Sequence, residues 1–298
     1  MLTIAVSSRS LFHVEDGHQI FETEGQDAFN QYMREKEALP LRPGPAFSLV
    51  KKLLALNCPG VRDKVEVVLL SRNSPDAGMR VMNSIAHYQL DIERAVFSQG
   101  SDRFRYAKAL GAQLFLSANA SDVRAAIEHG LAAATMVPIE QSHEFDDMTI
   151  RIALDGDSVV FSSEADEYYR QEGLAAFRLS ESAKAHIPLG DGPFRAFLQA
   201  LYDLQKQLPV DNPPLKVALV TARGLPSHAR VIYTLRSWGI RFHEAIFAGG
   251  HDKGPLLQAF GADLFFDDTQ KNIDSATSCG IMTGHVLYGA GEGITAVR

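Results

Sequence analysis

Two aspartates separated by one glycine, Asp155 and Asp157, form the feature of this sequence best suited to chemistry. The apolar run 152–154 leads into them, and a second apolar run follows them. One interpretation is a short buried strand that delivers two carboxylates at its C-terminal end. The other is an acidic turn, since Asp-Gly is a common turn pair. The choice depends on partners elsewhere in the chain.

Polar groups of complementary chemistry follow other predicted strands in the same half of the chain. Thr221 and Arg223 come after the apolar run 217–220, and the pair Asp267-Asp268 comes after 264–266. Lys253 lies near a predicted helix start. Ligands of open parallel sheets bind beyond the carboxyl ends of the strands. We therefore expect these groups to converge with the first aspartate pair on one crevice.

Such a set suits the transfer of a phosphoryl group to water. A carboxylate attacks phosphorus, and the covalent intermediate divides one difficult step into two easier ones. Magnesium, which takes oxygen ligands, screens that carboxylate from the anionic phosphate. A hydroxyl and a lysine bind the phosphoryl oxygens as charge builds there. A second carboxyl group protonates the leaving oxygen and later deprotonates the attacking water.

The elements that must position these groups alternate between strand and helix along the chain. This alternation predicts an α/β fold with a mostly parallel, doubly wound sheet. The second half repeats the first, at an offset of 150 residues from Val67 onward and of 148 upstream of it. We therefore predict an internal duplication, with one unit at 1–138 and another at 150–298, joined by a polar linker near 138–149.

The acidic cluster occurs in only one of the two predicted units. Where the second unit has Asp155, Asp157, Lys253, Asp267 and Asp268, the first has Ser7, Arg9, Arg103, Ser117 and Ala118. The first unit therefore lacks the acids that would hold magnesium or form an aspartyl phosphate. Arginine and small hydroxyl residues in their place suit an anion, so this unit either binds a nucleotide or is retained only for packing.

The strand-end motifs resemble those of the haloacid dehalogenase-like phosphohydrolases. The resemblance to the cytosolic 5′-nucleotidase type I family spans nearly the whole chain. It is carried by Ala5-Val-Ser-Ser-Arg-Ser-Leu-Phe12, Pro43-Gly-Pro-Ala-Phe47, Asn83-Ser-Ile-Ala-His-Tyr88, Val220-Thr-Ala-Arg223, Leu235-Arg-Ser-Trp-Gly239 and Lys253-Gly-Pro-Leu-Leu257. It implies magnesium-dependent hydrolysis of nucleoside 5′-monophosphates to nucleoside and phosphate.

The resemblance also implies a role for each matching residue. Asp155 would be the nucleophile and Asp157 the acid/base, while Thr221 and Lys253 would hold the phosphoryl group. The implied magnesium ligands are Asp155, Asp157, Asp267 and Asp268. Of the last pair we favour Asp268 as the direct ligand, with Asp267 acting through water.

Three further residues are candidates for contacting the substrate. Arg223 is a plausible phosphate clamp, because a guanidinium can meet two phosphate oxygens at once. The alternative is a surface arginine paired with a neighbouring acid. Arg9 and Asn73 lie in the predicted crevice of the first unit, where they would contact the nucleoside of the substrate or a separate nucleotide. Glu164, Asp166 and Glu167 are expected on a solvated helix face.

Composition narrows the function classes. The 298 residues carry a net charge of −7, which argues against a broad surface for nucleic acid polymers. No run reaches the roughly 18 apolar residues that a membrane span needs, and no basic leader precedes the first strand, so we expect a cytoplasmic protein. The resemblance implies a homo-oligomer. The functional alternatives are a phosphatase or phosphotransferase for another small phosphate ester, and a nucleotide-binding sensor without turnover.

Overall fold

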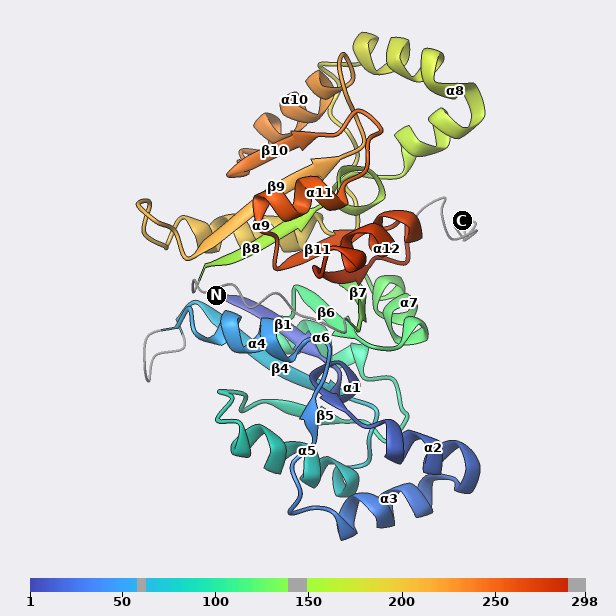
Figure 1. Ribbon diagram of the computed structural model, residues 1–298, viewed down its shortest axis with the longest axis vertical. Coiled ribbons are helices and arrows are strands. Elements are labelled where there is room, and N and C mark those ends of the chain that lie inside the picture. Colours follow the sequence, from blue (N-terminus) through green and yellow to red (C-terminus); the bar gives the residue numbers. More distant parts are fainter. Residues whose placement is uncertain (58–62, 139–148, 289–298) are drawn as a thin grey trace. The chain divides into compact units, whose positions relative to one another are not determined.

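The computed structural model describes residues 1–57, 63–138 and 149–288 of the chain. The predicted linker near 138–149 lies almost entirely outside these ranges. The described chain divides into two compact units, unit 1 from Met1 to Leu131 and unit 2 from Ala132 onward. Each unit is a mixed α/β structure with mostly parallel strands, so the predicted α/β class is confirmed (Figure 1).

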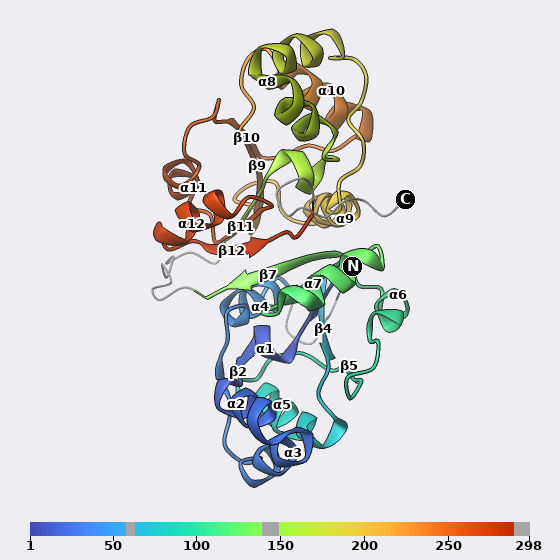
Figure 2. The ribbon, with the colours of Figure 1, turned by 90° about the vertical axis from the view of Figure 1, so that its right-hand side faces the viewer.

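Unit 1 is built on four parallel strands in the order β6-β1-β4-β5. Figure 2 shows α4 and α6 on opposite sides of this sheet. The single turn Phe104–Tyr106 precedes α6. The elements of unit 1 are β1 (Leu2–Val6), α1 (Ser8–Leu11), β2 (Phe12–His13), α2 (Glu15–Glu24), α3 (Gln26–Glu35), β3 (Arg42–Pro43), α4 (Phe47–Leu54), β4 (Val65–Ser71), α5 (Pro75–His87), β5 (Ala95–Phe97), α6 (Ala107–Leu110), β6 (Leu114–Ser117) and α7 (Ala120–Glu128).

Unit 2 has the strand order β10-β9-β8-β11-β12-β7, in which only the pairing of β12 with β7 is antiparallel. The single turn Gly156–Val160 follows β8. The elements of unit 2 are β7 (Ala132–Val137), β8 (Ile150–Leu154), α8 (Glu164–Ala183), α9 (Arg195–Gln205), β9 (Leu215–Thr221), α10 (His228–Trp238), β10 (Glu244–Phe247), α11 (Gly254–Phe260), β11 (Leu264–Asp267), α12 (Gln270–Ser278) and β12 (Met282–His285).

The inner strands β8, β9 and β11 of unit 2 are buried on both faces, which explains why they are almost continuously apolar rather than alternating. Phe265 points into a core formed with Leu257 of α11 and Ala276 of α12. Phe266, the next residue, packs on the opposite face against Phe197 of α9, at 6.1 Å between ring centroids. Figure 2 shows α11 and α12 on one side of these strands and α9 on the other.

A helical excursion leaves each unit after its first long parallel strand. In unit 2 it is α8, which bends at Gly173, where φ is +79° (Figure 1). In unit 1 it is the pair α2 and α3, which meet at Gly25, where φ is +89°. Glycine adopts positive φ without the steric penalty of a Cβ, so both bends are encoded locally. These excursions bring side chains of α2, α3 and α8 over the strand ends of their own unit.

Candidate active site

The polar cluster of unit 2 lies at the carboxyl ends of three neighbouring parallel strands. Leu154 of β8 is in register with Phe266 of β11 and with Leu219 of β9. Asp155 and Asp267 directly follow the first pair, and Thr221 ends β9. Parallel strands with matched register place their last residues at one edge of the sheet. The interpretation of Asp155 and Asp157 as a bare acidic turn is thus replaced by a turn at the end of a buried strand.

The ammonium of Lys253 sits between two carboxylates at the centre of this cluster. Its Nζ lies 2.8 Å from Asp155 Oδ1 and 2.7 Å from Asp267 Oδ2. The lysine side chain is only 1 % exposed. Burial disfavours the charged ammonium, but Asp155 and Asp267 outweigh that effect and raise the pKa of Lys253 above its ordinary value. The lysine therefore stays charged and fixes the two carboxylates in place.

Three carboxylates of the cluster can share one cation. One oxygen each from Asp155, Asp267 and Asp268 lie within 4.8 Å of one another. Burial and the nearby Asp267 raise the pKa of Asp155 well above its ordinary range, although Lys253 opposes this. Burial, Asp267 and Asp166 raise the pKa of Asp268 to about 8. Buried like charges of this kind are relieved by a cation, and an all-oxygen set suits a hard ion such as Mg²⁺.

The adjacent residues Asp267 and Asp268 differ in how many hydrogen bonds their carboxylate oxygens already accept. Asp267 accepts hydrogen bonds from the Thr269 N–H at 2.8 Å and from Asn272 Nδ2 at 3.0 and 3.1 Å, in addition to its contact with Lys253. Asp268 accepts a long bond, 3.4 Å, from Thr269 Oγ1. Asp268 therefore has more capacity left for a metal ion.

Asp157 is held by a buried arginine on both of its oxygens. Arg223 donates from Nε to Asp157 Oδ2 and from Nη2 to Asp157 Oδ1, each at 2.7 Å. The third side of the guanidinium donates to Glu181 of α8. Burial opposes the charge, but Asp157 and Glu181 together raise the pKa of Arg223 above its usual value. The alternative to a phosphate clamp, pairing with an acid, therefore describes the geometry, but the arginine is buried rather than on the surface.

The pairing of Arg223 continues into a chain of alternating charges. Arg230 of α10 donates from Nη1 to Glu181 Oε1 and from Nη2 to Glu164 Oε1, both at 2.7 Å. Its Nε donates to the Ile187 carbonyl at 2.8 Å. Glu181 is 3 % exposed. The chain Asp157–Arg223–Glu181–Arg230–Glu164 thus joins the strand-end turn to α8.

The turn that carries Asp157 is tightly constrained. Gly156 passes so close to β9 that a Cβ there would lie 3.2 Å from Thr221 Oγ1. Ser158 adopts φ of +62°, a left-handed conformation that non-glycine residues rarely take. Its Oγ donates to Asp166 Oδ2 at 2.9 Å. Local strain of this kind concentrates at functional sites.

Asp166 corrects the expectation that the start of α8 is a solvated acidic face. It is half-buried, and burial together with Asp157 raises its pKa to about 6. Glu164 is exposed yet paired with Arg230. Sequence patterns also missed Glu181 and Asn272. Neither lies in a motif, and Glu181 meets Arg223 from 42 residues away, so no local signal could have found it.

The structure does not bring all the predicted site residues into one cluster. Asp155, Asp157, Thr221, Arg223, Lys253, Asp267 and Asp268 lie together in unit 2. Arg9 and Asn73 instead line a cavity of unit 1. They belong to the strand ends of that unit, following β1 and β4 respectively.

Three carboxylates that could hold a metal ion, beside a buried lysine at the strand ends of an α/β sheet, define a candidate phosphohydrolase site. The chain belongs to the 5′-nucleotidase family, whose model matches residues 1–293. It is 36 % identical over 295 residues to the human protein called cytosolic 5′-nucleotidase 1B. That match covers 95 % of this chain and 48 % of the human protein, so the chain spans about half the length of this curated relative. No solved structure gives a significant match. Within the described residues, no helix is long and apolar enough to span a membrane.

Proposed function

We propose that this protein hydrolyses nucleoside 5′-monophosphates to nucleoside and phosphate. The observation that carries the proposal is the buried cluster of Asp155, Lys253, Asp267 and Asp268 at the strand ends of unit 2. Membership of the 5′-nucleotidase family supports the substrate class, and the name of the human relative supports a cytosolic location. The same cluster favours an enzyme over a nucleotide sensor, because binding alone does not need a carboxylate beside a buried lysine.

In this proposal Asp155 attacks the phosphorus atom and forms an aspartyl phosphate. Its Oδ1 lies 2.8 Å from Lys253 Nζ and accepts a hydrogen bond from the Gly156 N–H at 2.6 Å, so the carboxylate is held in one orientation. Lys253 and the Thr221 hydroxyl bind the phosphoryl oxygens, where negative charge develops. Water then releases phosphate from Asp155. Two moderate barriers replace one high one.

Asp157 is proposed as the acid that protonates the leaving oxygen and the base that activates water. Both of its oxygens accept hydrogen bonds from Arg223, so one of these bonds must be exchanged for the substrate during turnover. Arg223 consequently acts as a positioning residue for Asp157 rather than as the phosphate clamp predicted from the sequence. Its anchorage to Glu181 links this exchange to α8.

A haloacid dehalogenase-like use of magnesium fits the residues of the cluster. Asp155 and Asp268 would hold the ion directly, and Asp267, already bonded to Lys253 and Asn272, would act through water. Asp157 is not among the three clustered carboxylates, and both of its oxygens already accept a hydrogen bond from Arg223, so it is a less favourable ligand for the ion. Bound magnesium would neutralise the carboxylates and the phosphate so that the two can approach.

Residues 1–138 and 150–298 are proposed to derive from one duplicated α/β unit, with the catalytic set kept only in the second. Matched hydrogen bonds support this. The Leu41 N–H donates to Ser84 Oγ at 2.9 Å, and the Leu189 N–H donates to Thr234 Oγ1 at 2.9 Å. The offsets are 189 − 41 = 148 and 234 − 84 = 150, as in the sequence repeat. The same offsets relate three more pairs of hydrogen bonds. They are Arg80–Leu39 with Arg230–Ile187, Asn73–Ser71 with Arg223–Thr221, and Thr3–Gln113 with Arg151–Asp263.

Phosphate release from nucleoside monophosphates and sugar phosphates, with and without magnesium, tests the function. Asp155→Asn should lower kcat by several orders of magnitude, because the amide cannot act as the nucleophile. Asp203→Asn is the matched control, since this exposed carboxylate of α9 forms an ion pair only with Lys206 among the residues described and should leave kcat unchanged. Near-normal turnover by Asp155→Asn, or a clear preference for sugar phosphates, would overturn the assignment.

A further inference from the structure

A cavity of about 180 Å³ lies at the strand ends of unit 1. Its polar side is formed by residues that follow β1 and β4, including Ser8, Arg9 and Asn73. Its apolar side is formed by Phe21 of α2 and Phe29 of α3. The two rings meet edge to face at 6.2 Å between centroids, and Phe21 is 43 % exposed. The cavity thus has a polar end and an aromatic end.

The polar end carries an excess of positive charge. Arg9, Arg72 and Arg103 line the cavity, and Asp122 is the one acid among the described residues that line it. Asp122 lies 2.7 Å from Arg103 Nη2 and 3.4 Å from Arg72 Nη1, so a single carboxylate is shared between two guanidinium groups. Arg72 and Arg103 thus share one negative charge, and the described lining holds more basic than acidic side chains. An anion would complement it.

Two buried donors at this end have no hydrogen-bond partner within the described part of the chain. They are Asn73 Nδ2 and Arg103 Nε, and the whole Arg103 residue is only 3 % exposed. Burial lowers the pKa of the Arg103 guanidinium, and Asp122 offsets only part of that effect. Buried donors are almost always satisfied in folded proteins, so such a pair marks a place where a ligand or water belongs.

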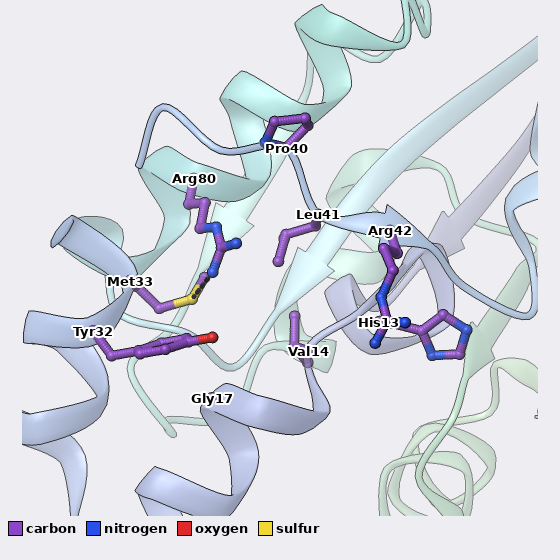
Figure 3. A pocket seen from close by; sticks show the side chains of 9 residues that line it. All are labelled: His13, Val14, Gly17, Tyr32, Met33, Pro40, Leu41, Arg42 and Arg80. Atoms are coloured by element: carbon purple, nitrogen blue, oxygen red, sulfur yellow. Dashed lines mark hydrogen bonds between the residues drawn. The ribbon is translucent and has the colours of Figure 1, made fainter. Parts of the chain in front are cut away.

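A second cavity of unit 1 shows the contrast. It measures about 70 Å³ and is lined by Tyr32, Met33 and Arg80 among others (Figure 3). Here the arginine is already engaged: its Nε donates to the Leu39 carbonyl at 3.0 Å, and its Nη1 contacts Met33 Sδ at 3.8 Å. Figure 3 draws the latter contact as a dashed line. This cavity is smaller, and the guanidinium of Arg80 already has partners, so an anion is not needed to satisfy it.

We propose that the strand-end cavity of unit 1 is a separate nucleotide-binding site, in which Asn73 and Arg103 hold a phosphate group and Phe21 and Phe29 hold the base. Phosphate groups are the anions that arginine binds through several parallel hydrogen bonds. A planar base packs favourably on an aromatic side chain. The site and the proposed hydrolysis are independent, because different units carry them.

The site binds nucleotide without hydrolysing it. Unit 1 has Ser7 and Ser117 at the strand ends where unit 2 has Asp155 and Asp267, so it lacks the carboxylate that attacks phosphorus. Arg103 occupies the position of Lys253 but faces no acid at either of those strand ends. The strand ends that are proposed to bind a cation in unit 2 therefore bind an anion in unit 1.

Isothermal titration of Asp155→Asn protein with magnesium tests the proposal, because this background removes turnover. The probes are AMP, GMP, CMP, UMP and inorganic phosphate. We expect two nucleotide sites per chain. Adding Arg103→Gln or Asn73→Ala should weaken one of them about tenfold or more, the effect of losing one charge-assisted bond. Arg105→Gln is the matched control, because Arg105 is exposed and does not line the cavity.

Far-ultraviolet circular dichroism verifies that each variant is folded. If Arg103→Gln does not fold, Asn73→Ala still provides the test, because Asn73 is partly exposed. Nucleotide binding that neither Arg103→Gln nor Asn73→Ala weakens would overturn the proposal, whether the background protein shows one site or two. Inorganic phosphate binding as tightly as every nucleotide would overturn the contacts with the base. A protein that proves inactive as a nucleotidase would leave this titration as informative as before.

Discussion

The buried charge chain of unit 2 predicts that two glutamates with the same bond length to one arginine differ widely in their contribution to stability. Glu181 and Glu164 each accept a 2.7 Å hydrogen bond from Arg230. The Glu181 side chain is 3 % exposed and also binds Arg223, whereas that of Glu164 is 48 % exposed. The substitutions Glu181→Gln and Glu164→Gln remove the charge and keep the size of the side chain.

The expected magnitudes follow from burial. Removing one partner of a buried ion pair costs about 3–5 kcal/mol, because the remaining charge is left uncompensated. The amide oxygen that replaces the carboxylate can still accept a hydrogen bond, so we expect the lower end, about 3 kcal/mol, for Glu181→Gln. An exposed pair contributes about 0–1 kcal/mol, which sets the expectation for Glu164→Gln. For a unit of this size the first value corresponds to a fall in Tm of roughly 6–12 °C.

Trp238 makes this measurement specific to unit 2, since it is the single tryptophan of the chain and packs against Phe161 at 5.4 Å between ring centroids. Urea unfolding followed by tryptophan fluorescence therefore reports the free energy of unfolding of this unit. Equal losses in the two variants would refute the reasoning, because bond length rather than burial would then set the contribution. A loss below about 1 kcal/mol for Glu181→Gln, the range of an exposed pair, would refute it as well.

Two further predictions concern the metal cluster. The pKa of Asp268 is raised to about 8 in the folded protein, against an ordinary value of 3.8. Metal-free protein should therefore lose stability as the pH rises from about 4 to 8. Added magnesium needs the ionised carboxylate, so it should raise Tm more at pH 8 than at pH 6. Thermal unfolding at both pH values measures this, with Asp268→Asn as the control that should reduce the difference. An effect of magnesium that does not change with pH would contradict it. Lys253→Met should destabilise unit 2 by about 3–5 kcal/mol, because it leaves Asp155 and Asp267 buried without their shared cation, and magnesium should restore part of that loss in the same fluorescence assay. A fully stable Lys253→Met protein would show that the two carboxylates do not need the ammonium.

Local patterns were sufficient to predict the α/β class and the strands that carry Asp155, Thr221 and Asp267. Each of these residues directly follows or ends an apolar run of strand length. In a parallel sheet with matched register, residues at strand ends meet regardless of how many residues separate them in sequence. The convergence of these residues and Lys253 was therefore predictable before the structure was known.

The pairing of charges, in contrast, depends on how the elements pack. Arg223 is bonded to Asp157, 66 residues away, and to Glu181, 42 residues away, on a helix whose first acidic residues were expected on a solvated face. In the same way, Phe21 and Phe29 form one wall of the unit 1 cavity only because the chain turns back at Gly25. Burial determines the strength of a charge pair, and burial is a property of the packed elements rather than of any motif. Local sequence patterns thus specify which residues stand at the strand ends, whereas tertiary packing selects the partners that hold them.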